Sequence, residues 1–210
     1  MRPLIKGLAG AALIAALAYS PPARRWYLTY GATDEEVVRP MPGDDLLADA
    51  GLLSTRAVTI DAPPEAVWPW LVQMGSGRAG AYTYDWIENL FGLGMHSADR
   101  ILPEFQGLAV GDVLPLGPDG PGMRVEICDG PRTLAFRSAD HTWVWIFGLY
   151  PERGGTRLVS RNRIAQPGAA PARRALNRIV LEPGSLVMER KMLNGIRDRA
   201  ESPVAEPQPA

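Results

Sequence analysis

One stretch of the sequence indicates the fold: Arg56-Ala-Val-Thr-Ile-Asp-Ala-Pro-Pro-Glu-Ala-Val-Trp-Pro-Trp-Leu-Val-Gln-Met74. Val58 and Ile60 alternate with less apolar residues, and this period of two predicts a short strand. Two consecutive prolines follow, and proline fits the first turn of a helix because the backbone donors of that turn have no helical acceptor. We expect the side chain of Asp61 to cap this helix. The stretch therefore predicts a strand that turns directly into a helix.

The segment after the prolines has helical periodicity. Val67, Leu71 and Met74 recur at the spacing of one helix face. A strand followed by D-A-P-P-E-x-V-W and an amphipathic helix resembles the opening of the SRPBCC superfamily, whose members have the START-like or helix-grip fold. The resemblance covers residues 53–199. It implies an α+β fold in which a curved antiparallel sheet wraps around a long C-terminal helix, with two short helices after the first strand, and it implies a cavity for an apolar ligand.

The remaining periodicities follow the same element order. A second helix is expected over Tyr82–Phe91, with Trp86, Leu90 and Phe91 on its apolar side. Strand-like segments separated by short Gly- and Pro-containing turns predict an antiparallel meander: Gly111–Leu116, Met123–Cys128, Thr133–Ser138, Thr142–Tyr150 and Thr156–Ile164. A helical period returns over residues 172–200, and we expect Pro183-Gly184 to interrupt it.

The chain divides into four parts. Residues 1–23 form a hydrophobic segment, residues 24–52 a linker strapped across the domain surface, residues 53–199 the START-like domain, and residues 200–210 a Pro-rich disordered tail. Within the linker, Thr33 and Glu36 have the spacing of a capping box, which predicts a short helix. This linker resembles the segment before the core in an actinobacterial-type SRPBCC subgroup that carries an N-terminal hydrophobic segment.

The N-terminal segment allows two interpretations. Residues 7–19 are uncharged and apolar, but they are shorter than the roughly 20 residues that span a hydrocarbon core. The basic start and the small residues of Ala16-Leu17-Ala18 are typical of a cleaved signal peptide. The alternative is a short membrane anchor, which the resemblance to the subgroup favours. We therefore expect a membrane-associated protein, with a secreted or a cytoplasmic one as alternatives.

Composition narrows the classes of partner and cofactor. The 22 basic and 23 acidic residues give a net charge of −1, which provides no general attraction to nucleic acid. Cys128 is the single cysteine, and His96 and His141 are the two histidines, so Cys- or His-rich metal sites are excluded. We expect no metal and no cofactor. The Gly75-x-Gly77-x-x-Gly80 motif has dinucleotide-binding spacing, but a helix and not a strand precedes it, so we interpret it as a turn at the cavity mouth.

The strand faces indicate which side chains line a cavity. In the last strand Arg157, Arg161 and Arg163 share one face, which we expect in water, so Ser160 and Asn162 should point inward and orient a ligand carbonyl or hydroxyl. Large apolar side chains with a few inward polar groups are typical of apolar ligand pockets. The expected ligand-binding residues are Trp143, Trp145, Phe147, Ser160, Asn162, Met123 and Trp86.

The richest polar chemistry lies between residues 82 and 104. Tyr84, Asp85 and His96 are the candidates for acid-base catalysis, and their segments resemble strings of the same SRPBCC subgroup. We expect binding of a small apolar ligand, such as a lipid, polyketide or isoprenoid, by a protein that is tethered to a membrane. One alternative is an enzyme of the polyketide cyclase or dehydratase kind, which requires at least one of the three residues at the cavity. The other is an interaction domain whose interior is packed solid.

Overall fold

The computed structural model describes residues 19–118 and 120–202. The expected hydrophobic segment up to residue 18 and the tail from residue 203 lie outside the described residues. Within the described part, no helix is long and apolar enough to cross a membrane.

The centre of the molecule is a six-stranded antiparallel sheet. Its strands are β1 (Leu52–Ile60), β2 (Val113–Leu114), β3 (Met123–Asp129), β4 (Thr133–Ser138), β5 (Trp143–Glu152) and β6 (Gly155–Ile164), in the order β1-β6-β5-β4-β3-β2. The first and last strands of the chain are neighbours in this sheet. β1 pairs with β6 along its whole length, from Leu52 opposite Ile164 to Ile60 opposite Thr156. The meander expected from short turns between strands is confirmed.

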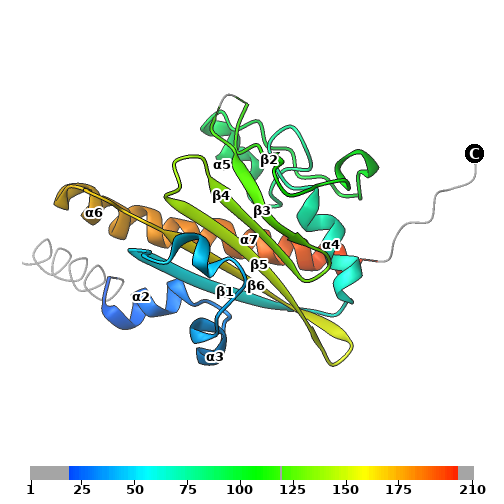
Figure 1. Cartoon of the computed structure of the whole chain (residues 1–210), viewed down its shortest axis with the longest axis horizontal. Coiled ribbons are helices and arrows are strands. Elements are labelled where there is room, and N and C mark those ends of the chain that lie inside the picture. Colours follow the sequence, from blue (N-terminus) through cyan, green and yellow to red (C-terminus); the bar gives the residue numbers. More distant parts are fainter. Residues whose placement is uncertain (1–18, 119, 203–210) are drawn as a thin grey trace, which may run out of the picture.

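A long C-terminal helix crosses one face of the sheet. It consists of α6 (Pro171–Leu176), a π-helical turn η3 (Asn177–Leu181) and α7 (Glu182–Glu201). Figure 1 shows α7 running behind the strands across the sheet. Two short helices, α4 (Pro64–Val72) and α5 (Asp85–Leu90), follow β1. This architecture is the helix-grip fold, and the prediction of fold class is confirmed.

The helix after β1 begins differently from the prediction. Its N-cap is Pro63, and no side chain caps it, so the prediction that Asp61 would do so is wrong. Pro63 and Pro64 have no backbone N–H, so two of the donors that a helix start leaves free are absent, and the Ala66 N–H bonds to the Pro63 carbonyl. The predicted apolar stripe of α4 is confirmed, since Val67, Leu71 and Met74 are all buried in the main core.

The C-terminal helix also departs from the prediction. Pro183-Gly184 does not interrupt it; the irregularity lies in the preceding turn, where the Glu182 N–H bonds to the Asn177 carbonyl five residues back. Proline cannot donate, and its ring would clash with the carbonyl four residues earlier, so a wider π turn lets the helix continue through Pro183.

The chain before β1 packs on both sides of the sheet. Its helix α2 (Pro21–Leu28) packs against α7 and β1, whereas Met41 and the 3-10 turn η1 (Asp44–Leu47) pack on the face opposite α7. The same part of the chain contains α3 (Asp34–Val38). A further 3-10 turn, η2 (Pro103–Phe105), lies between α5 and β2. The capping box of Thr33 and Glu36 is present, as predicted.

The expectation that the arginine face of β6 lies in water is wrong. Arg161 is 2% exposed and donates to the Glu36 carbonyl and the Asp44 carboxylate of the linker. The side chains of Arg157 and Arg163 are only 16% and 14% exposed, and they pair with the carboxylates of Glu36 and Asp44, respectively.

Candidate functional site

A cavity of about 890 Å³ lies between the sheet and the C-terminal helix. Its walls come from β1, β5 and β6 on one side, from η3 and α7 on the other, and from the segment around α5 at one end. The lining side chains are mainly apolar or aromatic, and several polar ones are set among them. The interior between sheet and helix is therefore not filled by the protein's own side chains, in contrast to the packed interaction domain considered as an alternative.

The mouth of the cavity lies between α5 and the start of the C-terminal helix. Four large apolar side chains line the cavity and are also more than half exposed: Phe91, Val180, Leu181 and Val187. Phe91 follows α5, whereas the other three lie on η3 and α7. These residues form the rim through which a ligand would enter.

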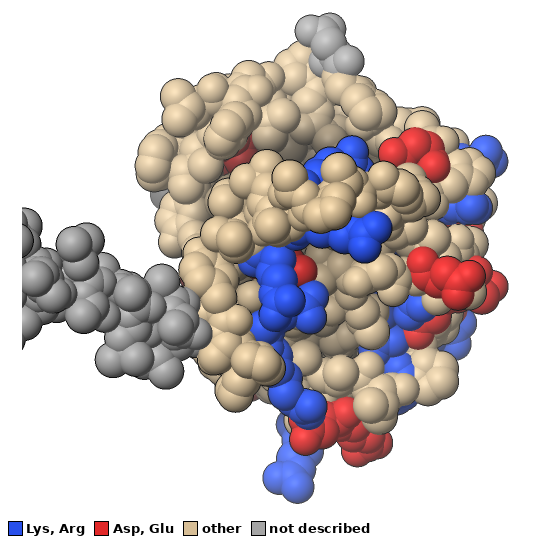
Figure 2. Space-filling model, turned by 90° about the vertical axis from the view of Figure 1, so that its left-hand side faces the viewer, with Lys and Arg blue, Asp and Glu red and all other residues tan. Residues whose placement is uncertain are grey.

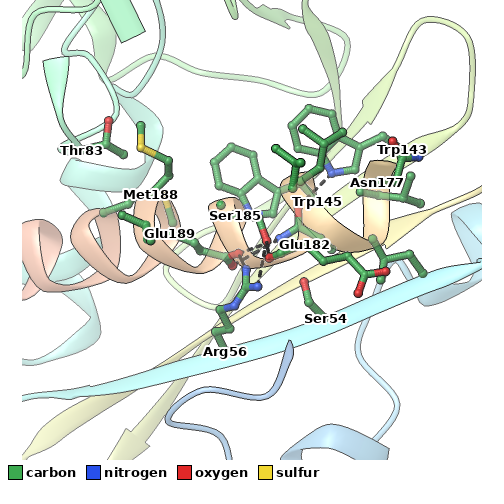
Figure 3. A pocket seen from close by; sticks show the side chains of 18 of the residues that line it. Ser54, Arg56, Thr83, Trp143, Trp145, Asn177, Glu182, Ser185, Met188 and Glu189 are labelled. Atoms are coloured by element: carbon green, nitrogen blue, oxygen red, sulfur yellow. Dashed lines mark hydrogen bonds and ion pairs between the residues drawn. The ribbon is translucent and has the colours of Figure 1, made fainter. Parts of the chain in front are cut away.

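A buried ion pair lies at the centre of the site. The Arg56 guanidinium on β1 contacts the Glu189 carboxylate on α7, and their side chains are 0% and 8% exposed. Arg56 also donates to the Ser185 hydroxyl (2.9 Å) and to the Tyr27 carbonyl (3.0 Å). Figure 3 shows Arg56, Ser185 and Glu189 converging at this point. Arg56 thus has three acceptors, two on α7 and one on α2, as a buried charge requires.

Two tryptophans extend this network along β5. Trp143 Nε1 donates to Asn162 Oδ1 (2.8 Å), and Trp145 Nε1 donates to Ser160 Oγ (3.0 Å). Ser160 in turn donates to Glu189 Oε1 (2.6 Å), and Asn162 Nδ2 lies 3.2 Å from the same oxygen. The indole rings stack with centroids 6.0 Å apart. The aromatic wall is therefore fixed in position by hydrogen bonds that end on the Glu189 carboxylate.

A second ion pair closes the wall near the mouth. Arg24 on α2 forms two hydrogen bonds with the Glu182 carboxylate, at 2.7 and 2.9 Å, and Glu182 is 5% exposed. The hydrogen bond to Glu182 raises the pKa of Arg24, although burial opposes this. The linker is thereby joined to the first turn of α7 beside the cavity.

The predicted ligand-binding residues fall into three groups. Trp143, Trp145 and Asn162 line the cavity, and Ser160 lies directly behind Trp145 with its hydroxyl in the network. Phe147 and Met123 do not line it; both belong to the packed main core. Trp86 is 70% exposed and does not line the cavity either.

The exposure of α5 explains the position of Trp86. The helix spans only Asp85–Leu90, shorter than predicted, and its apolar side does not face the core, because Trp86, Leu90 and Phe91 are 70%, 76% and 73% exposed. The prediction of a core-facing apolar side is wrong here. Tyr82, at positive φ, precedes the helix and enters the core in place of these residues.

The three acid-base candidates do not line the cavity. Asp85 accepts hydrogen bonds from the Ser97 backbone N–H (2.7 Å) and hydroxyl (2.6 Å). The Tyr84 ring lies under the Lys191 ammonium group, and His96 is exposed. The structure does not bring these groups beside Ser160 or Asn162. No group of three or more His, Cys, Asp or Glu that could hold a metal occurs among the described residues.

The glycine motif forms a turn, as expected, but Gly75, Gly77 and Gly80 do not line the cavity. Gly75 and Gly80, both at positive φ, bond to each other through their backbones, and Arg78 donates to the carbonyls of Val72, Met74 and Phe105. Arg78 thus holds the loop together.

Arg56 and Glu189 were missed as site residues. Arg56 begins the quoted stretch, and a charged residue in an apolar strand is a signal for a buried pair. Glu189 falls three residues after Leu186 and three before Met192, which places it on the apolar stripe of the helix. Both signals were present in the sequence, but only the fold brings the two residues together.

Comparisons with known proteins give similarity of structure alone. No protein-family model and no curated protein matches the chain. Among solved structures, it is similar to protein MLL2253 from Mesorhizobium loti (18% identity, TM-score 0.42, covering 70% of this chain and 96% of that one). It is also similar to protein BH1534 from Bacillus halodurans (19% identity, TM-score 0.41, covering 68% of this chain and 94% of that one). A third similar structure is the Polyketide_cyc-like protein Cgl2372 from Corynebacterium glutamicum (16% identity, TM-score 0.36, covering 70% of this chain and 86% of that one). At these identities and TM-scores no function is transferred.

Proposed function

We propose that this protein binds a small, largely apolar molecule in the cavity between the sheet and α7. The observation that supports this most strongly is the size of the open space, about 890 Å³, beside a core cluster whose members are almost fully buried. Protein interiors are close-packed and contain few voids larger than a water molecule. Pockets for small molecules have volumes of about 300–1,000 Å³ and mainly apolar walls with a few polar groups.

The energetics of the wall favour an apolar occupant. Burial of apolar surface lowers the free energy by about 25 cal/mol per Å², and a wall that stays in contact with water lacks this stabilisation. A ligand that covers the partly exposed side chains of Trp143 and Met188 would remove their surface from water without disturbing the hydrogen bonds behind it. Native mass spectrometry of the full chain tests this. We expect a mass in excess of the polypeptide that is lost on extraction with organic solvent, and reloading of the extracted protein with the recovered molecule. Failure of the extracted protein to take up any apolar molecule would contradict the proposal.

We also propose that the cavity mouth faces an anionic lipid surface. The rim is apolar and exposed, and Arg173, Arg174 and Arg178 on α6 and η3 are exposed beside it. Figure 2, which views the molecule from the end where α6 lies, shows basic side chains gathered in a band beside uncharged surface. Tyr19, the first described residue, donates to the Ile179 carbonyl (3.0 Å), so the start of the described chain lies beside η3. Basic and apolar groups together are what binds a membrane surface.

Vesicle co-sedimentation of the full chain tests the lipid surface. We expect tighter binding to phosphatidylcholine vesicles that contain phosphatidylglycerol than to those without it. Substitution of Arg173, Arg174 and Arg178 by Ala should remove this preference, whereas Arg153→Ala, at an exposed position in the β5–β6 turn, should keep it. Equal binding of the wild type to both vesicle types would contradict the proposal.

A further inference from the structure

The cavity wall contains a serine hydroxyl that has no partner and is open to the cavity. Ser54 on β1 lines the cavity and is 5% exposed. Its hydroxyl makes no hydrogen bond within the described part of the chain, and it is not among the unpartnered atoms that the protein encloses there. Figure 3 shows the Ser54 side chain pointing from β1 toward α7. Buried polar groups are nearly always paired, so this hydroxyl is available to a ligand.

Two carboxamides on the same wall are also without a partner. Asn177 on η3 and Gln166, two residues beyond the end of β6, line the cavity and are half-buried. Neither side chain makes a hydrogen bond to any described residue. Ile164, the last residue of β6, pairs with Trp143, and Figure 3 shows Trp143 and Asn177 at the end of the pocket away from Met188. The part of the cavity near η3 therefore presents neutral groups that donate and accept.

The opposite end of the cavity, around α5, is apolar. Ile87, Phe91 and Leu93 line it with partly or largely exposed side chains. Thr83 Oγ1 and Glu88 Oε2 belong to the same end, but the protein encloses both atoms. We therefore expect a ligand to place its apolar part toward α5 and its polar group toward η3.

The charged groups of the wall are already paired within the protein. Among the described lining residues Arg56 is the single basic one, and it is 0% exposed and bound to Glu189. Glu182 is bound to Arg24. An anionic ligand group would find no free cation on this wall and would lie near two carboxylates. An uncharged polar group avoids this, because hydroxyls and carboxamides can both donate to it and accept from it.

We propose, on the basis of the ligand-binding function proposed above, that Ser54, Asn177 and Gln166 bind the uncharged polar group of an amphipathic ligand. The hydroxyl and the two carboxamides match a group with several donors and acceptors, such as the glycerol hydroxyls of a monoacylglycerol. The acyl chain of such a ligand lies toward α5. The cavity therefore selects a neutral polar group over a carboxylate on the same chain.

Three ligands with one decanoyl chain test this selection. 1-Monodecanoylglycerol has free hydroxyls, methyl decanoate has an ester that only accepts, and decanoate is an anion at neutral pH. Displacement of N-phenyl-1-naphthylamine from the full chain should give an inhibition constant for decanoate at least about tenfold above that for 1-monodecanoylglycerol. Equal constants for these two would overturn the inference while leaving the ligand-binding function intact. If neither the dye nor any of the three ligands binds, the ligand-binding function fails and the inference fails with it.

Substitutions locate the polar group near η3. Ser54→Ala and Asn177→Leu should each weaken 1-monodecanoylglycerol by about threefold or more, and weaken methyl decanoate less, because it lacks the hydroxyls. Asn177→Lys should tighten decanoate by about tenfold, because a free cation then lies beside the carboxylate. Asn194→Lys makes the same change at a half-buried position of α7 that does not line the cavity, and it should leave all three constants unchanged.

The location is overturned if folded Asn177→Lys binds decanoate no more tightly than the wild type does. It is equally overturned if folded Ser54→Ala and Asn177→Leu weaken methyl decanoate as much as 1-monodecanoylglycerol, since the effect would then not depend on the hydroxyls.

Discussion

The Arg56 guanidinium and the Glu189 carboxylate form an ion pair that joins the first strand of the sheet to the terminal helix beneath the cavity. The same carboxylate accepts from Ser160 and Asn162 on β6, so one acidic side chain of α7 is bound to two neighbouring strands. A helix held at this distance by polar contacts cannot collapse onto the sheet without breaking them. We infer that the network keeps the cavity open.

Breaking this pair should destabilise the fold strongly. Arg56→Met leaves the Glu189 carboxylate buried without its cation, and removal of one partner of a buried pair costs about 3–5 kcal/mol. Urea unfolding followed by circular dichroism measures the loss. Arg56→Met combined with Glu189→Leu should recover much of it, because no unpaired charge remains. A loss below about 1 kcal/mol for the single variant would show that the pair is of little consequence. Arg132→Met, which breaks an exposed pair with Asp129, should leave stability unchanged.

The free energy of unfolding should depend on pH through the ionisation of Glu88. Its pKa is raised on folding, chiefly by burial, so the folded state holds the proton more tightly than the unfolded state. Stability therefore falls as the pH rises through the range above about 4.5, the ordinary value. Glu88→Gln should remove this fall and be more stable than the wild type near neutral pH. Thermal unfolding at several pH values checks this, with Glu152→Gln as the control. An unchanged pH profile for Glu88→Gln would contradict the assignment.

Glu36 should show the opposite dependence. Burial alone would raise its pKa, but the hydrogen bonds from Arg157 and Thr33 outweigh burial and lower it. The ionised Glu36 carboxylate therefore stabilises the fold above about pH 4.5, and this stabilisation is lost as the pH falls through the folded-state pKa. Glu36→Gln should lower the unfolding temperature at neutral pH and converge with the wild type in acid. Glu35→Gln, exposed on the same helix, should not; equal effects of the two would contradict this account of how the linker is held.

Gly184 should accept alanine with a gain in stability. It lies in the helix where α7 begins, and a Cβ added there would meet no atom within 4 Å. Glycine inside a helix is less stable than alanine by about 0.5–1 kcal/mol. Chemical denaturation of Gly184→Ala should show an increase of this size. A decrease would mean that the position requires glycine for a reason other than space.

Local patterns predicted most of the fold. The strands from Met123 to Ile164 follow from alternation between short turns, and α4 follows from the stripe that contains Val67 and Leu71. The predictions of burial that were wrong concern residues whose exposure depends on contacts with distant parts of the chain. Trp86 is apolar at helical spacing but is exposed, because α5 forms part of the cavity rim. Arg161 shares a face with other arginines but is buried, because the linker supplies acceptors from residues more than 100 positions away.

The site was harder to predict than the fold. Trp143, Trp145 and Asn162 were found because they alternate along strands on the inner face. Arg56 and Glu189 lie 133 positions apart, and their pairing follows only from the crossing of α7 over β1. Glu88 is buried on a short helix whose apolar residues are exposed, and the sequence pattern contains no signal for that reversal.

The binding of the neutral dye N-phenyl-1-naphthylamine to wild type, Gly184→Ala and Gly184→Trp tests the cavity most directly. Gly184 lines the cavity beside open space, so an indole at this position would occupy volume that a ligand needs. The account predicts saturable fluorescence enhancement with one dye per chain for wild type and Gly184→Ala, and a dissociation constant at least about tenfold higher for Gly184→Trp. Absence of saturable binding to the wild type, or equal binding by a folded Gly184→Trp, would contradict it.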